Sequence, residues 1–208
     1  MSAFITLEGP EGGGKTLQAR RLASHLESLG HEVVLTREPG GTGIGDQIRK
    51  VLTLLDNTAM DAHTEFLLFS ASRAQLVNEL IRPQLELDKI VVCDRFYDSS
   101  LAYQGFGQGL DLDMLRQVTE FATGGLVPDL TLLLDLDVGH GLRRRESGGN
   151  WNRLDAYDVA FHQRVREGYL QLAQQDSDRW VVIDAELEID QVETAIRKAV
   201  DRFVQDRT

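Results

Sequence analysis

The sequence predicts an α/β fold in which a five-stranded parallel sheet is flanked by helices. Three features predict it: five short apolar runs rich in branched residues, segments with helical spacing between them, and a glycine-rich turn after the first run. Continuous apolarity is typical of strands that are buried on both faces. Alternation of such strands with helices favours a parallel sheet with right-handed crossovers.

The predicted strands all combine continuous apolarity with short length. They are residues 3–8 (AFITLE), 33–37 (VVLTR), 90–94 (IVVCD), 130–136 (LTLLLDL) and 180–184 (WVVID). The predicted helices have leucines or other apolar residues at helical spacing, as in 16–30, where Gly30 ends the helix. The others are 44–55, 64–85, 113–123, 155–175 and 190–205.

Composition limits the possible classes of protein. With 208 residues and 42% hydrophobic content, the chain suits one domain spanning 1–208. A formal net charge of -11 argues against a nucleic-acid partner, because such partners need a basic surface. The single cysteine, Cys93, excludes an intrachain disulfide, and no charged leader or membrane-length apolar run is present, so we expect a cytoplasmic protein without a membrane partner.

The turn GPEGGGKT, residues 9–16, fits the pattern of Gly, four residues, Gly, Lys, Thr between a predicted strand and a predicted helix. This is the context of a phosphate-binding loop (P-loop), whose backbone N–H groups surround phosphate oxygens at a helix N-terminus. The predicted ATP-binding residues of this turn are Gly9, Pro10, Glu11, Gly12, Gly13, Gly14, Lys15 and Thr16. A turn that only caps a helix is the structural alternative.

Lys15 and Thr16 give the turn its predicted chemistry. The lysine can bridge the β- and γ-phosphates, and the threonine hydroxyl can complete the shell of a Mg²⁺ ion held by those phosphates. We therefore expect ATP with Mg²⁺. A GTP switch would also need an Asn/Thr-Lys-x-Asp element to read guanine, and no lysine of this chain has an aspartate two residues later.

Polar residues follow the second and third predicted strands, where ligands of open α/β sheets collect. Arg37 and Glu38 follow one strand, and Asp94 and Arg95 end the next. Charged pairs at the end of a buried strand are costly unless they have partners or a function. A buried structural ion pair is the alternative for Asp94 and Arg95.

Several motifs together resemble bacterial thymidylate kinase. They are the P-loop, REPGGT at 37–42, FSASR at 69–73, DRFYDSSLAYQG at 94–105 and an arginine-bearing segment at 143–153, and they occur in the family's order and spacing over essentially the whole chain. The resemblance implies a P-loop kinase fold and transfer of the γ-phosphoryl group of ATP to thymidine monophosphate.

The resemblance also implies roles for individual residues in binding the acceptor nucleotide. Phe69 would stack on thymine, Arg73 would bind its 4-oxygen, Ser100 and Gln104 would face the remaining polar edge, and Tyr103 would press on the deoxyribose. Arg95 would bind the acceptor phosphate, Asp94 would organise that phosphate and the metal, and Glu11 would face the 3′-hydroxyl. As alternatives from sequence alone, Phe69 could belong to the core, Tyr103 and Gln104 could be ordinary helix residues, and the serines could cap a helix.

The chain lacks the basic P-loop residue that some relatives use in phosphoryl transfer, so a cation is expected from the segment 143–153, interpreted as a closing lid. Arg153 is the preferred catalytic candidate, Arg143 is assigned to ATP, and Arg144 and Arg145 are further candidates. A solvated arginine-rich loop is the alternative.

The resemblance also implies a homodimer, formed by helices around 44–85 and 95–123.

Three other functions fit parts of the sequence. Another small P-loop kinase could act on a different nucleotide or on a nucleoside. An ATP-dependent partner-binding switch would leave the motif at 94–105 without a purpose, and a nucleic-acid motor is disfavoured by the acidic composition.

Overall fold

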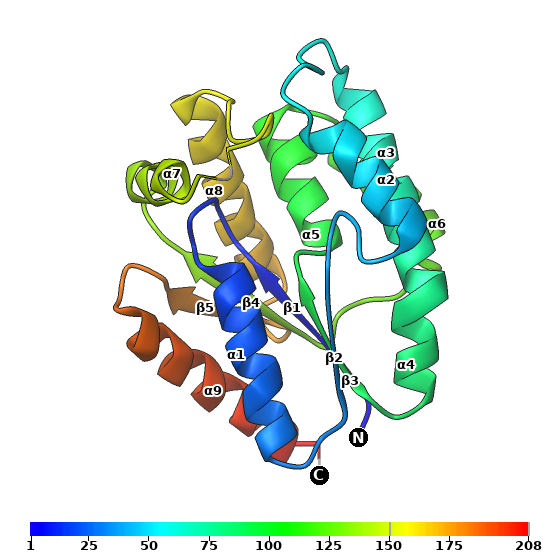
Figure 1. Cartoon of the computed structure of the whole chain (residues 1–208), viewed down its shortest axis with the longest axis vertical. Coiled ribbons are helices and arrows are strands. Elements are labelled where there is room, and N and C mark those ends of the chain that lie inside the picture. Colours follow the sequence, from blue (N-terminus) through cyan, green and yellow to red (C-terminus); the bar gives the residue numbers. More distant parts are fainter. Residues whose placement is uncertain (150, 208) are drawn as a thin grey trace.

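The computed structural model describes residues 1–149 and 151–207. Its centre is a five-stranded parallel sheet in the order β2-β3-β1-β4-β5, as Figure 1 shows. The strands are β1 Ala3–Glu8, β2 Val33–Arg37, β3 Ile90–Asp94, β4 Leu130–Asp135 and β5 Trp180–Asp184. These match the predicted strands, except that β4 ends one residue earlier.

The polar residues at the strand ends come together because neighbouring strands are in parallel register. Leu7 in β1 pairs with Asp94 in β3, and Arg37 in β2 pairs with the same Asp94. The predicted acceptor residues and the P-loop after β1 therefore leave the sheet at the same edge.

Helices cover both faces of the sheet. On one face lie α1 Lys15–Ser28 and α9 Ile189–Gln205, which run side by side in Figure 1. Leu22 and Leu26 of α1 and Ile196 of α9 pack with Ile5 and Leu132 in one core cluster. The apolar stripe predicted along the first helix is thus partly the face that contacts the sheet.

The second face carries the helices that form the substrate side of the molecule. They are α2 Gly43–Thr53, α3 Ala62–Leu76, α4 Arg82–Glu86, α5 Tyr97–Ser100, α6 Leu112–Thr123 and α8 Val159–Gln175, with two wider π-helical turns, η1 Val77–Ile81 and η2 Leu101–Gly107. Tyr169 of α8, Tyr103 of η2 and Leu133 of β4 share one core cluster. Phe4, Val91 and Phe96 form another with η1.

Three predicted boundaries were wrong. The segment 64–85 is not one α-helix, because η1 interrupts it before Pro83 begins a new turn. The helix predicted from 155 begins at Val159, where the Asp158 side chain caps it. The supposed flap 143–153 begins inside a helix, α7 Val138–Ser147, capped by Asp137, and Asn150 of that segment lies outside the described residues.

Within the described part of the chain, no helix combines the length and apolarity that a membrane crossing requires.

Candidate functional site

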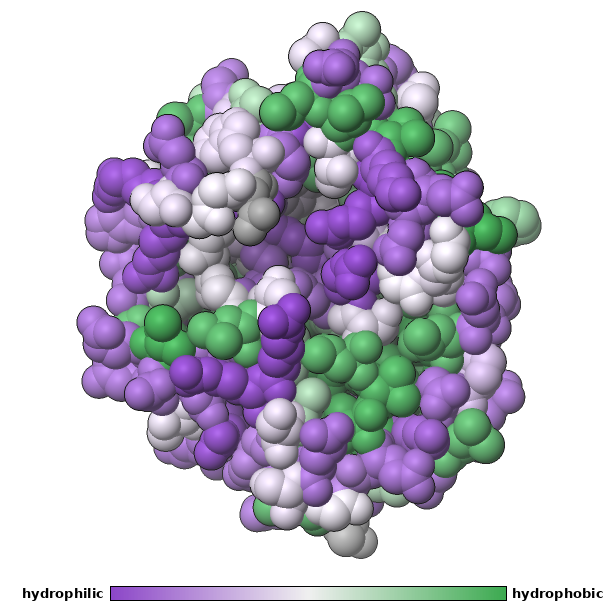
Figure 2. Space-filling model, in the orientation of Figure 1, coloured by the Kyte–Doolittle hydropathy of each residue, from purple (hydrophilic) through white to green (hydrophobic). Residues whose placement is uncertain are grey.

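A cleft of about 930 Å³ opens where the carboxyl ends of β1, β2 and β3 meet the helices. Figure 2 shows it as a hollow lined by hydrophilic residues near the middle of the molecule. Residues from the P-loop, the ends of β2 and β3, α3, η2 and α7 line it. The cleft therefore joins the predicted ATP loop to the predicted acceptor residues.

Two positions of the P-loop require glycine, Gly12 because of a close backbone contact and Gly14 because of its left-handed backbone conformation. At Gly12, where φ is +74°, an added Cβ would lie 2.1 Å from the backbone oxygen of Gly141 in α7. Gly14, at φ +79°, caps α1 without a side-chain hydrogen bond. The N-terminal N–H groups of α1 are consequently left for an anion.

Lys15 lies folded over the loop. Its Nζ donates to the backbone oxygens of Gly9 at 3.0 Å and Pro10 at 2.6 Å. Burial and the neighbouring Arg95 guanidinium lower the pKa of Lys15 to about 8, although Glu11 opposes them. The ammonium group is held at the loop by acceptors that a phosphate can replace.

Thr16 and Asp94 lie together at the mouth of the cleft. The Thr16 hydroxyl donates a hydrogen bond to the Asp94 carboxylate, and both residues line the cavity. Within the described residues no group of three or more histidines, cysteines or acids forms a protein metal cage. A hydroxyl and one carboxylate suit Mg²⁺, which takes few protein ligands where phosphates supply the rest.

Arg95 occupies the centre of the site with a strained backbone, at φ +71°. Its guanidinium donates to Glu11 at 2.9 Å, to the Gly9 carbonyl and Tyr169 hydroxyl at 3.0 Å each, and to the Tyr103 hydroxyl at 3.2 Å. Burial lowers the pKa of Arg95, but Glu11 and the two tyrosines outweigh it, so the pKa rises well above its ordinary value.

Glu11 is the acidic partner of that arginine. It accepts 2.8 Å and 2.9 Å hydrogen bonds from Tyr103 and Arg95. Burial raises the pKa of Glu11, but Arg95 and Lys15 outweigh burial and lower the pKa to about 2. The carboxylate is therefore charged at neutral pH and holds Arg95 over the P-loop.

Glu8 was not identified from the sequence. It binds Ser99 and Tyr169, two side chains that also contact Arg95. Glu8 is fully buried and accepts hydrogen bonds from Phe96 N at 2.7 Å, Ser99 Oγ at 2.6 Å and Tyr169 OH at 3.0 Å. Burial, together with Asp98, raises the pKa of Glu8 to about 7. Its position inside the run AFITLE, directly before the turn, was the available signal, because a buried carboxylate needs donors.

Arg73 and Glu38 form a buried ion pair beside the cleft, with Nη2 2.7 Å from Oε2. Arg73 also donates to Ser100 Oγ at 3.0 Å, while its Nη1 is buried and has no partner among the described residues. Phe69 is one helical turn away on α3, half-buried, and lines the cavity. An aromatic side chain thus lines the cleft one helical turn from a buried guanidinium donor that does not line it.

Tyr103 and Gln104 lie on η2 and line the same cavity with Ser100. Tyr103 is fixed by Glu11 and Arg95, whereas Gln104 donates its amide nitrogen to Glu65 at 2.7 Å. Tyr103 and Gln104 are both buried, and the surface that each lines is that of the cleft.

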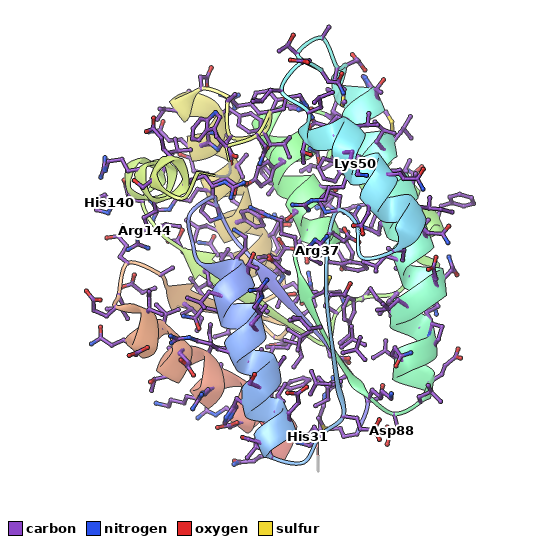
Figure 3. All side chains as sticks on the ribbon, in the orientation of Figure 1. His31, Arg37, Lys50, Asp88, His140 and Arg144 are labelled. Atoms are coloured by element: carbon purple, nitrogen blue, oxygen red, sulfur yellow. The ribbon has the colours of Figure 1, made fainter. Side chains whose placement is uncertain are left out.

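Arg37 is half-exposed at the end of β2 and points toward the cleft in Figure 3. The peptide bond between the following residues, Glu38 and Pro39, is cis. Arg49 of α2 also lines the cleft and donates to the Pro39 carbonyl at 2.8 Å, a contribution that the sequence analysis missed. Its position after REPGGT, one or two turns into a helix, carried no signal specific to a binding site.

The structure brings most predicted site residues together, but it does not bring Arg153 to the cleft. Arg153 is 6% exposed and donates to the Leu52 carbonyl at 2.9 Å, to Glu65 and to Tyr157. Its guanidinium is taken up by buried acceptors, so this placement does not support the catalytic role expected from the sequence. Arg143 does not line the cleft either.

Two other arginines of α7 do line the cleft. Arg144 donates to the Ala185 carbonyl at 2.9 Å and lies below α7 in Figure 3. Arg145 contacts both oxygens of the buried Asp155 at 3.0 Å and 3.1 Å. Arg145 therefore reaches the cleft while it is anchored to Asp155.

Comparison with known proteins gives one consistent family. A sequence model described as thymidylate kinase matches residues 7–196. The thymidylate kinase of Deinococcus radiodurans is 53% identical over 197 residues, which cover 95% of both chains, and that of Herpetosiphon aurantiacus is 50% identical over 90% of both.

The fold agrees with this relationship. The crystal structure of thymidylate kinase from Ehrlichia chaffeensis superimposes with a TM-score of 0.79 at 34% identity, covering 96% of this chain and 98% of that one. The chain belongs to the thymidylate kinase family.

Proposed function

We propose that the protein transfers the γ-phosphoryl group of ATP to thymidine 5′-monophosphate, giving thymidine diphosphate and ADP for DNA precursor synthesis. The observation that carries the proposal is the shared cleft, which is lined by the P-loop, Arg95, Phe69 and Gln104. Family membership adds the substrate, and the described site residues fit it.

ATP would bind with its phosphates on the N–H groups of residues 9–16, where Lys15 would exchange its two backbone acceptors for phosphate oxygens. Thr16 and Asp94 would hold the accompanying Mg²⁺, which supplies charge neutralisation for the phosphates. Arg37 and Glu38 border the acceptor side, and Arg49 adds a cation there.

The acceptor needs no strong general base. The second pKa of a phosphate monoester is near 6, so the attacking oxygen is ionised at neutral pH. The protein must instead align two anions and neutralise a loose transition state. Arg95 would bind the acceptor phosphate, held in place by Glu11, and Tyr103 would cover the deoxyribose where a ribonucleotide carries its 2′-hydroxyl.

We assign the transition-state cation of the lid to Arg145 rather than to Arg153 or Arg143. Arg145 lines the cleft, whereas Arg143 and Arg153 do not, and Arg153 is bound to Glu65. Residues 138–153 would form the lid, and its closure would exclude water, which otherwise competes as the acceptor.

A homodimer is proposed as well, through α2, α3 and α6. Large apolar side chains on these helices are exposed, including Val51 at 45%, Leu67 at 56% and Phe121 at 89%. Sedimentation of the purified protein measures this directly, and a mass of one chain at micromolar concentration would reject it.

The buried thiol of Cys93 and the nature of the substrates support a cytoplasmic location.

The reaction is tested by incubating the protein with ATP, Mg²⁺ and each of the common nucleoside monophosphates and free thymidine, with separation of the products. Formation of thymidine diphosphate at the highest rate supports the proposal. Preference for another acceptor would indicate a different P-loop kinase, and slow ATP hydrolysis without any diphosphate product would indicate a switch.

A further inference from the structure

Glu65 is a buried carboxylate that lies behind the wall of the cleft. The residue is 0% exposed and sits in the first turn of α3, between the cleft and the segment around Arg153. It does not line the cleft. A carboxylate in this position is costly unless its oxygens are fully hydrogen-bonded, so its partners indicate what it is for.

Four donors from two other parts of the chain converge on it. Glu65 Oε1 accepts from Gln104 Nε2 and Gln108 Nε2, each at 2.7 Å. Its Oε2 accepts from Arg153 Nη2 and, at 3.1 Å, from the Tyr157 hydroxyl. Glu65 therefore connects η2, which forms one wall of the cleft, to the residues that follow the lid helix.

This arrangement fixes the orientation of the Gln104 amide. Both oxygens of Glu65 accept hydrogen bonds, Oε1 from the two glutamine amides and Oε2 from the guanidinium and the tyrosine hydroxyl. Gln104 must therefore turn its nitrogen toward Glu65 and its oxygen the other way. No donor from the described residues contacts that amide oxygen, and Gln104 lines the cleft.

Gln104 therefore offers the cleft an acceptor, its amide oxygen. Arg73 does not line the cleft, but its buried Nη1 is an unpartnered donor on the same helix as the cleft-lining Phe69. A pyrimidine with a carbonyl at position 4 and an N–H at position 3 matches this pair. Cytosine presents an amino group and a bare nitrogen at the same positions, so both contacts would be mismatched.

We propose that Glu65 is a positioning residue for base selectivity, which holds the Gln104 amide so that the cleft accepts a hydrogen bond from the N3–H of thymine and rejects cytosine. The proposal rests on the proposed function. Glu65 acts through Gln104 and does not touch the substrate. Glu65 also connects Gln104 to Arg153, because it accepts hydrogen bonds from both.

Glu65→Gln is the direct test. The oxygen of the new amide is expected to stay on Arg153 and Tyr157, which leaves its nitrogen facing Gln104 and Gln108. Gln104 must then turn its own oxygen inward and present nitrogen to the cleft. We expect the KM for thymidine monophosphate to rise at least tenfold, while kcat and the KM for ATP change less than threefold.

The selectivity ratio is the more specific readout. The ratio of kcat/KM for thymidine monophosphate over deoxycytidine monophosphate is expected to fall at least tenfold in Glu65→Gln. Gln108→Leu is the matched control, because Gln108 also donates to Glu65 but does not line the cleft. Its ratio should stay within twofold of that of the unmodified protein, and an equal fall in both variants would overturn the proposal.

A double-mutant cycle separates positioning from a general disturbance of the fold. In a Gln104→Leu background, Glu65→Gln should change the ratio less than twofold, because the amide that it orients is gone. An undiminished effect there, or an unchanged ratio in folded Glu65→Gln, would overturn the proposal.

Folding and function have their own controls. If Glu65→Gln does not fold, Glu65→Gln combined with Arg153→Gln leaves no unpaired buried charge. Selectivity is expected to fall in it as well, because no group that only accepts hydrogen bonds then holds the Gln104 amide in one orientation. An unchanged ratio in that double variant overturns the proposal. An unmodified protein that does not phosphorylate thymidine monophosphate would instead reject the proposed function, so the two failures are distinguishable.

Discussion

Arg95 Nη2 lies 2.9 Å from Glu11 Oε1, and this contact joins the end of β3 to the P-loop. Each residue is 15% or 16% exposed, so the pair is poorly screened by water. The contact sets the distance between the group that would hold the acceptor phosphate and the loop that would hold ATP. The arrangement of the two substrates is therefore built into the protein before either binds.

Replacing Lys15 by methionine should reduce turnover about a hundredfold, on the order of 3 kcal/mol of transition-state stabilisation. The lysine is the cation of the P-loop, and among the described residues it donates hydrogen bonds to two carbonyls of that loop. Steady-state rates of phosphoryl transfer measure this. Lys50→Met is the control, since Lys50 is exposed on α2 (Figure 3), and its rate should remain within twofold.

Arg145→Gln should lower kcat about a hundredfold while the protein stays folded. The substitution removes the charge near the P-loop but retains an amide that can donate to Asp155. Rates measured well below the unfolding temperature test the assignment. A change of less than threefold would remove Arg145 from the proposed mechanism.

The same substitution at Arg153 should act mainly on stability. Glu65 would then keep a buried charge without its cation, a loss of about 3 kcal/mol or more in the free energy of unfolding. Urea unfolding of Arg153→Gln beside Arg145→Gln makes the comparison. A stable Arg153→Gln protein with a hundredfold lower kcat would restore the role that the sequence alone suggests.

The pH dependence of stability should contain a contribution from Glu8. Its folded pKa, about 7, is above the unfolded value of 4.5, so the folded state binds more protons between these values. The free energy of unfolding should therefore fall by about 3 kcal/mol as pH rises through this window. Glu8→Gln should abolish this fall and be the more stable protein at pH 8.

Glu11 provides a control of opposite sign. Its folded pKa, about 2, is below 4.5, so its stabilisation is present above pH 4.5 and is lost as pH falls toward 2. Glu11→Gln should be less stable than the unmodified protein at pH 7 and should converge with it in acid. Parallel pH profiles of the two variants would contradict both assignments.

The contact between the P-loop and α7 should not tolerate a single added methyl group. At Gly141 a Cβ would lie 2.2 Å from the Glu11 backbone oxygen, so Gly141→Ala must displace α7 or the loop. We expect a loss of about 1–3 kcal/mol in unfolding free energy and a higher KM for ATP. Gly43→Ala, whose Cβ meets nothing within 4 Å, should leave both unchanged within error.

The sheet could be predicted from the sequence because its strands are buried on both faces and therefore read as continuous apolar runs. Helix α7 could not. Residues 138–147 are polar and arginine-rich, and their helix depends on the Asp137 cap and on contacts of Gly141 with the P-loop, which are distant in sequence. Local pattern alone predicted a flap from residue 143 to 153.

Some residues of the site could likewise be located from the sequence, and others could not. The positions of Lys15, Thr16, Asp94 and Arg95 at the cleft could be predicted because a motif or a strand end fixes where they lie. Arg153 was expected at the cleft but does not line it, because its partner, Glu65, is 88 residues away and no spacing rule indicates such a pair. Glu8 and Glu65 escaped notice because each acts through tertiary donors instead of a local motif.

The most direct test is a crystal structure of the protein with thymidine monophosphate bound. The account predicts the thymine ring against Phe69, its 4-oxygen at Arg73 Nη1, and its phosphate at Arg95, with the sugar beside Tyr103. A nucleotide bound elsewhere, or one whose phosphate lies away from Arg95, would contradict the central claim that this cleft aligns the acceptor with the P-loop.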